Sequence, residues 1–527
     1  MDAPAQHTVT RRSSLILWAL LALSIVAFSY LVTLLLAFAC IALSFFAFRA
    51  GLNIQLIALG ACGLIIGFTI LWSLIPRHDK FEPPGALLVR SCYPRFFAEL
   101  DRIANSLNEQ LPGEVYLVHD VNAWVTERGG VMGFGGRRVM GVGLPLLSVL
   151  TISQFRAVLA HEFGHYYGGD TRLGPFVYKS RDGMVRTLKS LGEPSEILRF
   201  VARYAIAYLL YKAVVGTMVG YWKLFLRATQ MISRRQEYRA DELACQLVGS
   251  QALIDGLRTI HGADLAVSSY WNHEISPLVG AGFRAPISEG FCRFVAAPQV
   301  SKSILEHVDR NLREAKTDPY DSHPPLRDRI AAASKWPGST QPREDDRAST
   351  LLDDLEAAEL ELLLTLNPNL KQRSLRLLSW DNYTAEFLLP TWKENVAPLA
   401  ALFAPITTES LPGAIKNLVQ IGSQIPDPPG VLLDPRQRAV RAVELLGVAL
   451  GLVLLDHGWT MFAQPGQFYL KRGDEELNPL SMVAHLADGD ITREAWIERC
   501  QSLGVFGLPL SKPSADASPE TKLPLPA

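Results

Sequence analysis

The chain begins with two apolar stretches that are each long enough to cross a membrane. Residues 15–48 contain no charged side chain, and residues 56–75 form a second apolar run after a short polar turn. At about 1.5 Å per residue, the first run makes a helix longer than one hydrocarbon core requires, so we expect a single long or tilted helix there. The pattern predicts a membrane anchor over residues 1–80, with two transmembrane helices at about 15–48 and 56–75.

A different pattern follows the anchor and predicts a small sheet and then an amphipathic helix. Residues 115–119 are apolar and rich in strand-forming residues, and residues 131–143 have the glycine pattern of a hairpin. Apolar residues then recur at helical spacing after Thr151 and Gln154, which form the pattern of a capping box. We expect Gly168-Gly169 to end this helix.

The C-terminal third has a composition of its own. Residues 336–350 have the composition of a linker, and residues 351–510 form a region of unknown role that contains two amphipathic helical patterns. The tail at 511–527 is rich in Pro, Ser and Ala, and we expect it to be disordered. The whole chain is therefore predicted to be α+β and mainly α-helical, with transmembrane helices at the N-terminus and a helical C-terminal region.

Composition and charge indicate where in the cell the protein is located. The chain is 49% hydrophobic, which suits an integral membrane protein with a soluble head, and its net charge of −1 gives no reason to expect nucleic-acid binding. Basic residues precede the first apolar run and follow the second, whereas Arg49 stands alone between them. The positive-inside rule therefore places both ends, and the domain at 81–335, in the cytoplasm. Six scattered cysteines agree with a reducing compartment.

The residues with the clearest chemistry are His161-Glu-Phe-Gly-His165. On a helix the two imidazoles lie one turn apart on one face and can hold one Zn²⁺, while Glu162 can act as general base on a metal-bound water. The bare pattern should occur by chance in roughly one chain in a hundred of this length. The position of the pentapeptide in an amphipathic helix is therefore stronger evidence for a zinc site than the pattern alone.

A catalytic zinc needs a third protein ligand. Downstream candidates are His261, His273, His307, His323 and several carboxylates. The best candidate is Glu237, because Asp241 follows at i+4 and can accept the second N–H of a ligating imidazole. Ser233 and Gln236 suggest a capping box that starts this helix, and Gly249 suggests its end. A solvated charged helix face is the alternative interpretation of the same residues.

These motifs resemble the HtpX and CAAX-prenyl-protease family of membrane zinc endopeptidases, the gluzincins. The resemblance rests on the pentapeptide, on Glu237-Tyr-Arg-Ala-Asp241, on Asn122-Ala-Trp124 and on the segment that begins Asp321-Ser-His323-Pro-Pro. It covers roughly residues 85–335 and implies a zincin-like domain with one Zn²⁺ per chain. It implies His161, His165 and Glu237 as ligands, Glu162 as base and His323 as a stabiliser of the oxyanion.

Two of these assignments have alternatives. His323 is followed by two prolines in a stiff loop that can aim it into a cleft, but it can equally cap or pack under the following helix. An open strand beside the zinc helix can pair with an extended peptide, which makes Asn122, Val131, Met132 and Gly133 candidate substrate-binding residues. The same strands also suit an ordinary sheet that supports the helix.

The zinc site also restricts the third apolar stretch, residues 197–226. A single crossing there would put Glu237 on the opposite side of the bilayer from His161, and two crossings need about 40 residues where about 30 are available. We expect a membrane-apposed helical insert with Tyr, Trp and Lys at headgroup depth.

These observations predict a zinc metalloendopeptidase in the bacterial inner membrane, with a cytoplasmic catalytic domain. By the resemblance, its partners are the bilayer and polypeptide substrates, in particular damaged or misassembled membrane proteins. One alternative is a non-proteolytic membrane adaptor with a structural metal, and another is a metal-dependent amidase. The substrate specificity, the regulation and the oligomeric state do not follow from the sequence.

Overall fold

The computed structural model describes residues 12–51, 53–75, 81–129, 136–166, 184–192, 196, 200, 203–314, 323–338, 343–372, 374–428 and 431–512. The chain divides into two compact units, each made of two segments. Unit 1 comprises residues 1–267 and 303–372, and unit 2 comprises residues 268–302 and 373–527. These boundaries differ from the linker expected at 336–350. The expected disordered tail falls almost wholly outside the described residues.

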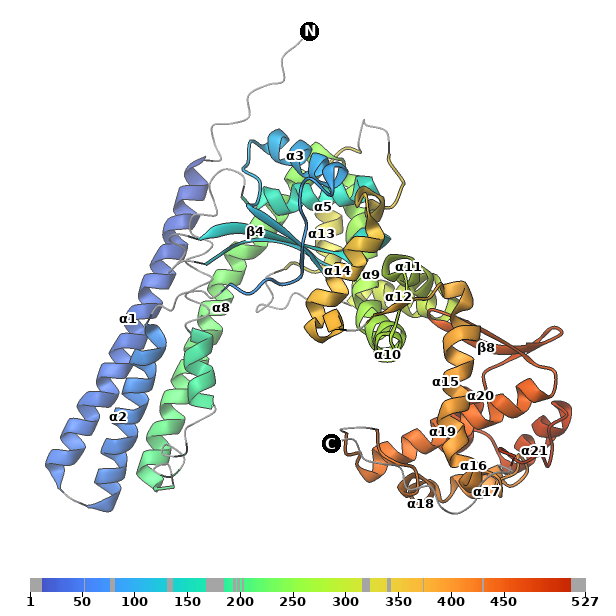
Figure 1. The fold of residues 1–527 in the computed structure, drawn as a ribbon. Helices are drawn as coiled ribbons and strands as arrows, with labels where there is room; N and C mark the ends of the chain where they lie inside the picture. Colours follow the sequence, from blue (N-terminus) through green and yellow to red (C-terminus); the bar gives the residue numbers. More distant parts are fainter. Residues whose placement is uncertain are drawn as a thin grey trace, which may run out of the picture. The chain divides into compact units, whose positions relative to one another are not determined.

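An antiparallel pair of long helices forms the N-terminal part of unit 1 (Figure 1). Helix α1 runs through Arg12–Ala50 and helix α2 through Ile54–Leu74, so the expectation of one long helix and a second shorter one is confirmed. The two helices pack closely because Gly63 and Gly67 face α1: a Cβ on Gly63 would lie 2.7 Å from the carbonyl oxygen of Cys40. Small residues spaced by four are a common way for membrane helices to approach each other.

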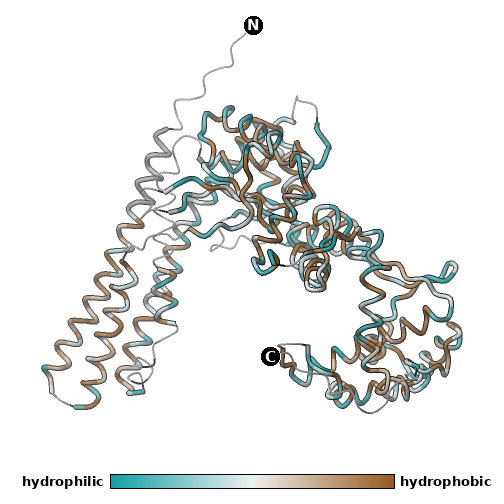
Figure 2. Tube along the Cα trace, in the orientation of Figure 1, coloured by the Kyte–Doolittle hydropathy of each residue, from teal (hydrophilic) through white to brown (hydrophobic). Residues whose placement is uncertain are grey.

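A third helix completes this bundle and continues into the rest of the unit. Helix α8, Ala205–Leu247, is 43 residues long and packs along α2 with its N-terminal half. Apolar side chains of all three helices and of the short helix at 184–192 meet in one cluster, which contains Cys62, Ile66, Leu191 and Val214. Figure 2 shows that apolar residues predominate along α1 and α2. The bundle therefore has the packing of a small helical membrane domain.

Among the described residues, three helical segments are long and apolar enough to cross a membrane: Ser24–Ala50, Ile54–Leu74 and Ala205–Arg227. The third coincides with the stretch for which we expected a helix at the membrane surface. The helix at 184–192 lies beside it, since the Tyr211 hydroxyl donates a hydrogen bond of 2.7 Å to the Leu191 carbonyl. The helix at 184–192 and the N-terminal part of α8 thus lie side by side in the bundle. The surface position of residues 197–226 stays a prediction, but the helix there belongs to the bundle.

Unit 1 also contains a four-stranded sheet with the order β1-β2-β4-β3. Its strands are β1 (Ala86–Leu87), β2 (Glu114–Val118), β3 (Ala123–Arg128) and β4 (Arg137–Gly143). Strands β2 and β4 are parallel, whereas β1–β2 and β3–β4 are antiparallel. The expected strand at 115–119 is confirmed as β2. Part of the hairpin expected within 131–143 lies outside the described residues, and the antiparallel partner of β4 is β3, which precedes that range and is an edge strand.

Helix α5, Ile152–Gly164, lies under this sheet and begins as its sequence predicts. The Thr151 hydroxyl accepts a hydrogen bond from the Gln154 N–H, and the Gln154 side chain accepts one from the Thr151 N–H, which completes the capping box. The helix ends at Gly164, earlier than the expected stop at Gly168-Gly169, which lies outside the described residues. Nearly all its side chains are buried, and Phe155 stacks on Phe96 of α3 (Pro94–Leu107).

The remaining elements of unit 1 surround α5 and α8. They are α4 (Leu144–Val149), α9 (Ser250–Tyr270), α12 (Pro298–Glu314), α13 (Leu326–Ala333), α14 (Leu355–Leu366) and the short helices Ala348–Leu351 and Pro368–Gln372. Residues 344–348 lie against the start of α5: the Ile152 N–H bonds to the Asp346 carbonyl at 2.9 Å. Arg156 of α5 pairs with Glu99 and Glu344, so this segment is fixed to the helix.

Unit 2 is mainly helical, with a small antiparallel sheet β7-β8-β9. Its core collects large apolar side chains, among them Trp392, Phe403 and Trp496. Its helices are Trp271–Ile275, α10 (Ser276–Gly280), α11 (Ile287–Ala296), Trp380–Asn382, Thr384–Leu388, α15 (Leu389–Val396), Ala397–Leu399, α16 (Ala400–Phe403), α17 (Leu411–Ile415), α18 (Leu418–Ser423), α19 (Pro435–Asp456), α20 (Pro479–Asp488) and α21 (Arg493–Ser502). Its strands are β5 (Phe283–Arg284), β6 (Arg376–Leu377), β7 (Thr460–Gln464), β8 (Gln467–Arg472) and β9 (Glu475–Leu477). The mainly helical fold with small sheets and N-terminal apolar helices is the predicted fold class.

Candidate metal centre

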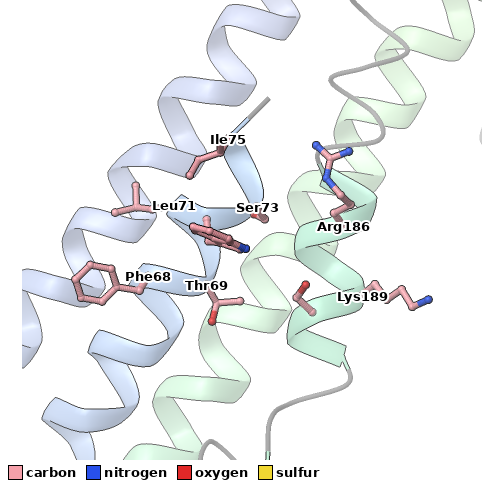
Figure 3. Close-up of a pocket in the computed structure, with 9 residues that line it drawn as sticks. Phe68, Thr69, Leu71, Ser73, Ile75, Arg186 and Lys189 are labelled. Carbon is pink, nitrogen blue, oxygen red and sulfur yellow. The ribbon is translucent and has the colours of Figure 1, made fainter. Parts of the chain in front are cut away.

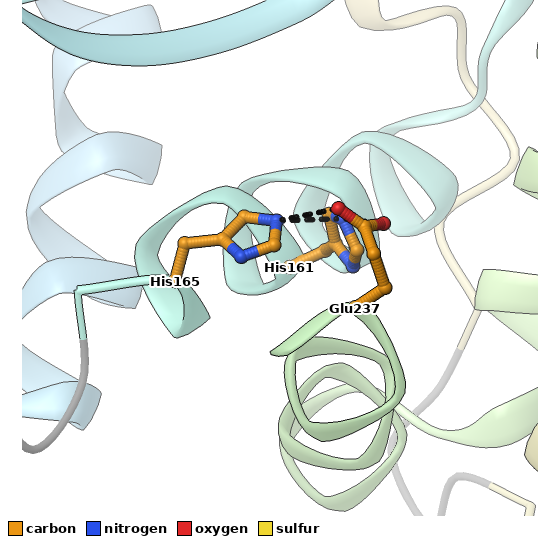
Figure 4. Close-up of side chains that lie close together, drawn as sticks. All are labelled: His161, His165 and Glu237. Atoms are coloured by element: carbon orange, nitrogen blue, oxygen red, sulfur yellow. Dashed lines mark hydrogen bonds and ion pairs between the residues drawn. The ribbon is translucent and has the colours of Figure 1, made fainter. Parts of the chain in front are cut away.

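The two histidines of the pentapeptide lie at the C-terminal end of α5. His161 is in the last turn, and His165 is the residue that caps the helix with helical backbone angles. Their Nε2 atoms are 3.2 Å apart, and both rings face α8 (Figure 4). His161 is buried and His165 is partly exposed. The predicted arrangement of both imidazoles on one helix face is therefore present.

Helix α8 brings Glu237 to these imidazoles because the two helices approach closely. A Cβ on Gly164 would lie 3.2 Å from the Cα of Ala240, so a side chain larger than hydrogen at residue 164 would press against α8. Ala240 lies between Glu237 and Asp241, which face α5 together. The small residue inside the pentapeptide thus permits a site that is shared between two helices.

Ser233 and Gln236 do not start this helix, so the second capping-box prediction is wrong. Both lie inside α8, where the backbone N–H groups are bonded to the preceding turn and need no side-chain cap. The expected end is confirmed: α8 stops at Leu247, and Gly249 follows with a φ of +109°. The apolar half of α8 and its ligand-bearing half are therefore one continuous helix.

The distances between the three side chains suit a single metal ion. Glu237 Oε2 lies 3.6 Å from His161 Nε2, and Glu237 Oε1 lies 3.5 Å from His165 Nε2. Ligand atoms that are 2.0–2.1 Å from a tetrahedral zinc are separated from each other by about 3.3 Å. In the described part of the chain, no other group of three His, Cys, Asp or Glu side chains brings its ligand atoms within 4.8 Å of one another.

Asp241 contacts the Nδ1 side of the His161 ring, and Arg329 in turn binds Asp241. Asp241 Oδ1 is 2.9 Å from His161 Nδ1, the contact that fixes the tautomer with Nε2 free for a metal. Arg329 of α13 donates two hydrogen bonds to the Asp241 carboxylate, at 2.6 and 2.9 Å, and its Nη1 is 3.8 Å from Glu237. The sequence analysis did not identify Arg329. Its position six residues after His323 in the resembling segment was the only signal.

His323 lies beside the ligand Glu237 rather than at a helix end. Its Nδ1 is 3.0 Å from Glu237 Oε2, its side chain is 61% exposed, and no side chain caps the following α13. Glu237 Oε2 is buried, and its contacts lack hydrogen-bond geometry. A buried carboxylate oxygen without a hydrogen bond is costly unless a cation satisfies it, which is the role of a metal ligand.

The charges of the site favour the ionisation states that a metal needs. Burial opposes ionisation of Glu237, but His323, His161 and His165 together lower its pKa to about 2. Burial and the neighbouring His161 lower the pKa of His165 to about 4, which keeps this imidazole neutral at physiological pH. A carboxylate and a neutral imidazole are the forms that bind zinc. The donor set, the distances and the orphaned oxygen all fit Zn²⁺.

Glu162 has a different environment, suited to proton transfer. Burial and the Glu237 carboxylate raise its pKa, His161, Arg329 and His323 oppose this, and the result is about 7. A carboxyl group with this pKa can both accept and release a proton near neutral pH. Glu162 therefore differs from Glu237, although the two carboxyl groups belong to the same site.

The other candidate ligands lie elsewhere. His261 and His307 both contact the side-chain amide of Asn311, at 2.7 Å each, and His273 contacts Ser269. Among the candidate substrate-binding residues, Asn122 is exposed, and its carbonyl accepts a hydrogen bond from Gly143. Val131, Met132 and Gly133 lie outside the described residues. Strand β3 is tied to the zinc helix, since the Tyr166 hydroxyl donates a hydrogen bond of 2.8 Å to the Val125 carbonyl.

Two histidines four residues apart on one helix, a glutamate from a second helix and an adjacent acidic residue define the class of gluzincin-type metallopeptidase sites. The comparison with known families agrees: the model of peptidase family M48 matches residues 95–337. Residues 95–337 are thus similar to peptidase family M48. The family match covers β2, β3 and β4 of the sheet, α5, the whole of α8 and α13.

Similar proteins carry the name Protease HtpX. The protein of Pseudomonas putida strain GB-1 is 28% identical over 201 residues, which are 37% of this chain and 56% of that protein. The protein of P. putida strain W619 is 32% identical over 129 residues, 23% of this chain and 42% of its own length. The protein of Pseudomonas fluorescens strain SBW25 is 27% identical over 175 residues, which are 32% of this chain and 56% of that protein. The chain spans about half the length of the curated relatives it matches.

Proposed function

We propose that the chain is a membrane-anchored zinc endopeptidase. The observation that supports this most strongly is the donor set of His161, His165 and Glu237, with Glu162 beside it at a pKa of about 7. A structural metal site needs no base at this place, which argues against the non-proteolytic adaptor. Zinc, when bound, polarises a peptide carbonyl and lowers the pKa of a water molecule.

The side chains have separate tasks in this proposal. Glu162 takes a proton from the attacking water and passes it to the leaving amine. Asp241 and Arg329 hold His161 in the tautomer that presents Nε2. His323 is exposed next to Glu237, where a substrate can reach it, and we propose that its ring N–H stabilises the developing oxyanion.

An extended polypeptide is the substrate that the surroundings favour. Strand β3 is an edge strand next to α5, and main-chain hydrogen bonds along such an edge orient a peptide with little sequence specificity. We therefore propose polypeptides, in particular misassembled membrane proteins, as substrates. A small-molecule amidase would not need an open strand.

The membrane orientation is also a proposal. The ends of α1 and α2 that carry the basic flanks lie on the side of the bundle where the catalytic domain is attached (Figure 1). The positive-inside rule then puts the zinc site in the cytoplasm of a bacterial inner membrane. A reporter fused after residue 90 should be active in its cytoplasmic form. Strong extracytoplasmic activity would overturn this orientation.

The replacement Glu162→Gln tests the catalytic mechanism. The variant should bind about one zinc per chain, as the wild type does, because no ligand is changed. Casein cleavage should fall at least about a hundredfold, because the base is lost. Cleavage at the wild-type rate would refute the mechanism. Products cut within long peptides would distinguish an endopeptidase from an amidase.

A further inference from the structure

A cavity of about 710 Å³ opens on the membrane bundle, away from the zinc site. It lies between the C-terminal part of α2 and the helix at 184–192. The α2 wall is mainly apolar, with Phe68, Leu71, Trp72 and Ile75 beside the hydroxyls of Thr69 and Ser73. The other wall carries Arg186, Lys189 and Ser190 (Figure 3). The two kinds of side chain therefore come from opposite walls.

The depth of this cavity in a bilayer follows from the helices that form it. Helix α2 ends at Leu74, so the cavity is at the end of a candidate span, on the side where the chain enters the sheet of unit 1. The Ser73 and Thr187 hydroxyls share a hydrogen bond of 2.5 Å and fix the second helix at this level. Trp72 is 68% exposed there. Exposed tryptophan and basic residues at the end of a span are typical of headgroup depth.

The cations of the cavity have no acidic partner within the bundle. Neither α1, α2, the helix at 184–192 nor the span Ala205–Arg227 contains an Asp or Glu residue. The Nε of Arg186 is buried and has no hydrogen-bond partner in the described part of the protein. A buried guanidinium N–H without an acceptor destabilises the fold. The described residues of the bundle therefore supply no acceptor for this N–H, and an anionic ligand would supply one.

We propose that this cavity binds one molecule of an anionic phospholipid. Its phosphate pairs with Arg186 and Lys189, and one acyl chain lies against Phe68, Leu71 and Trp72. The volume is in the range of ordinary ligand sites, and a guanidinium is well suited to pair with a phosphate. Basic pockets between membrane helices on the cytoplasmic side are places where anionic headgroups bind. The lipid would fasten the helix at 184–192 to α2, and through the contact of that helix with Tyr211 it would support α8.

Native mass spectrometry of the full chain in detergent tests this proposal. The Glu162→Gln variant serves as the parent protein, which prevents self-digestion and makes the result independent of peptidase activity. The probes are phosphatidylglycerol and phosphatidylcholine with identical acyl chains. One phosphatidylglycerol should be retained per chain, at least about fivefold more tightly than phosphatidylcholine. Equal retention of the two lipids would overturn the proposal.

Variants assign the binding to the cavity. Arg186→Gln should weaken phosphatidylglycerol retention about fivefold, and the double variant with Lys189→Gln about thirtyfold, whereas Arg186→Lys should largely restore it. Lys223→Gln, which removes an exposed cation of α8 outside the cavity, should change it less than about twofold. Wild-type retention by a double variant that melts at the wild-type temperature would refute the proposal.

Two further outcomes separate the sources of the anion. Trp72→Ala should loosen the lipid several-fold, because part of the apolar wall is lost. Excess inorganic phosphate should not displace the lipid, since it cannot replace the acyl contacts. Displacement by phosphate alone would show a simple anion site and contradict the lipid assignment. Retention that is independent of Arg186 would show that a carboxylate of the chain already fills its place.

Discussion

In the described part of unit 1, two pairs of histidines lie where helices meet, and one of these pairs belongs to the candidate metal centre. His161 and His165 lie where α5 meets α8, and His261 and His307 lie where α9 meets α12. Each pair is next to a glycine that permits a close approach: Gly164 faces Ala240, and Gly262 faces Ile304. Close helices with paired imidazoles are therefore not sufficient for a metal site.

The difference lies in the groups that surround the rings. The first pair is completed by the carboxylates of Glu237 and Asp241, whereas the Nε2 atoms of the second pair both contact the neutral amide of Asn311. Burial and the nearby His307 lower the pKa of His261, and among the residues that the structure describes no third ligand meets the pair. An anionic third ligand and a second carboxylate that orients the first imidazole are what distinguish a candidate metal centre from a structural contact.

The largest loss of zinc affinity and cleavage should come from replacing Gly164. Gly164→Val should lower zinc affinity and casein cleavage at least about a hundredfold, because added methyl groups force α5 away from α8 and displace the ligands. Gly262→Val is the matched control: it should lower the melting temperature and leave zinc affinity unchanged. Isothermal titration with zinc checks both variants. An equal loss of zinc affinity in the two would show that global stability, and not ligand geometry, is being measured.

Arg329 should have the next largest effect. Arg329→Gln should lower zinc affinity about ten- to a hundredfold, because Asp241 loses its bidentate partner and no longer orients His161 firmly. Arg327→Gln is the control, since Arg327 is on the same helix and pairs only with its neighbour Asp328 in the described structure. Chelator competition measures the two dissociation constants. Equal affinities for the two variants would rule out this role of Arg329.

The second pair should tolerate change. His261→Ala and His307→Ala each remove one contact to Asn311, so the free energy of unfolding should fall by about 0.5–1.5 kcal/mol. Zinc content should stay at one per chain in both variants. Thermal unfolding and elemental analysis check these values. A loss of zinc in either variant would mean that this pair contributes to metal binding.

The smallest change in stability should come from removing the ion pair between Glu344 and Arg156 near the start of α5. The hydrogen bond from Arg156 lowers the pKa of Glu344 in the folded protein. The ion pair therefore stabilises the fold fully above the pKa that Glu344 has in the unfolded chain, and this stabilisation is lost as the pH falls through the lower pKa of the folded state. Glu344 is half exposed, so Glu344→Gln should cost at most about 1 kcal/mol at pH 7. The difference from wild type should shrink as the pH falls and vanish once Glu344 is protonated in both the folded and the unfolded state. A difference that persists there would point to packing instead of charge.

The sequence predicted the local parts of this site well because its signals are local. Thr151 and Gln154 form the capping box that was expected, and the spacings of His161 with His165 and of Glu237 with Asp241 placed each pair on one helix face. Arg329 could not be found in the same way, because its partner Asp241 is 88 residues away and only the packing of α13 on α8 brings them together.

Helix α8 shows the limit of such patterns in another way. Its N-terminal half is apolar and its C-terminal half is charged, so periodicity suggested two elements with a start at Ser233. One continuous helix satisfies both halves because the first packs in the apolar bundle and the second packs against α5. A pattern of capping residues does not start a helix when a preceding turn already supplies the hydrogen bonds.

The most direct test of the central claim is metal analysis and casein cleavage on the same preparations of wild type, Glu237→Ala and Glu242→Ala. Glu242 is on the same helix and contacts Gln246, outside the donor set. We predict one zinc per chain and full cleavage for wild type and Glu242→Ala, and loss of both in Glu237→Ala. Zinc and cleavage at wild-type levels in Glu237→Ala would contradict the account.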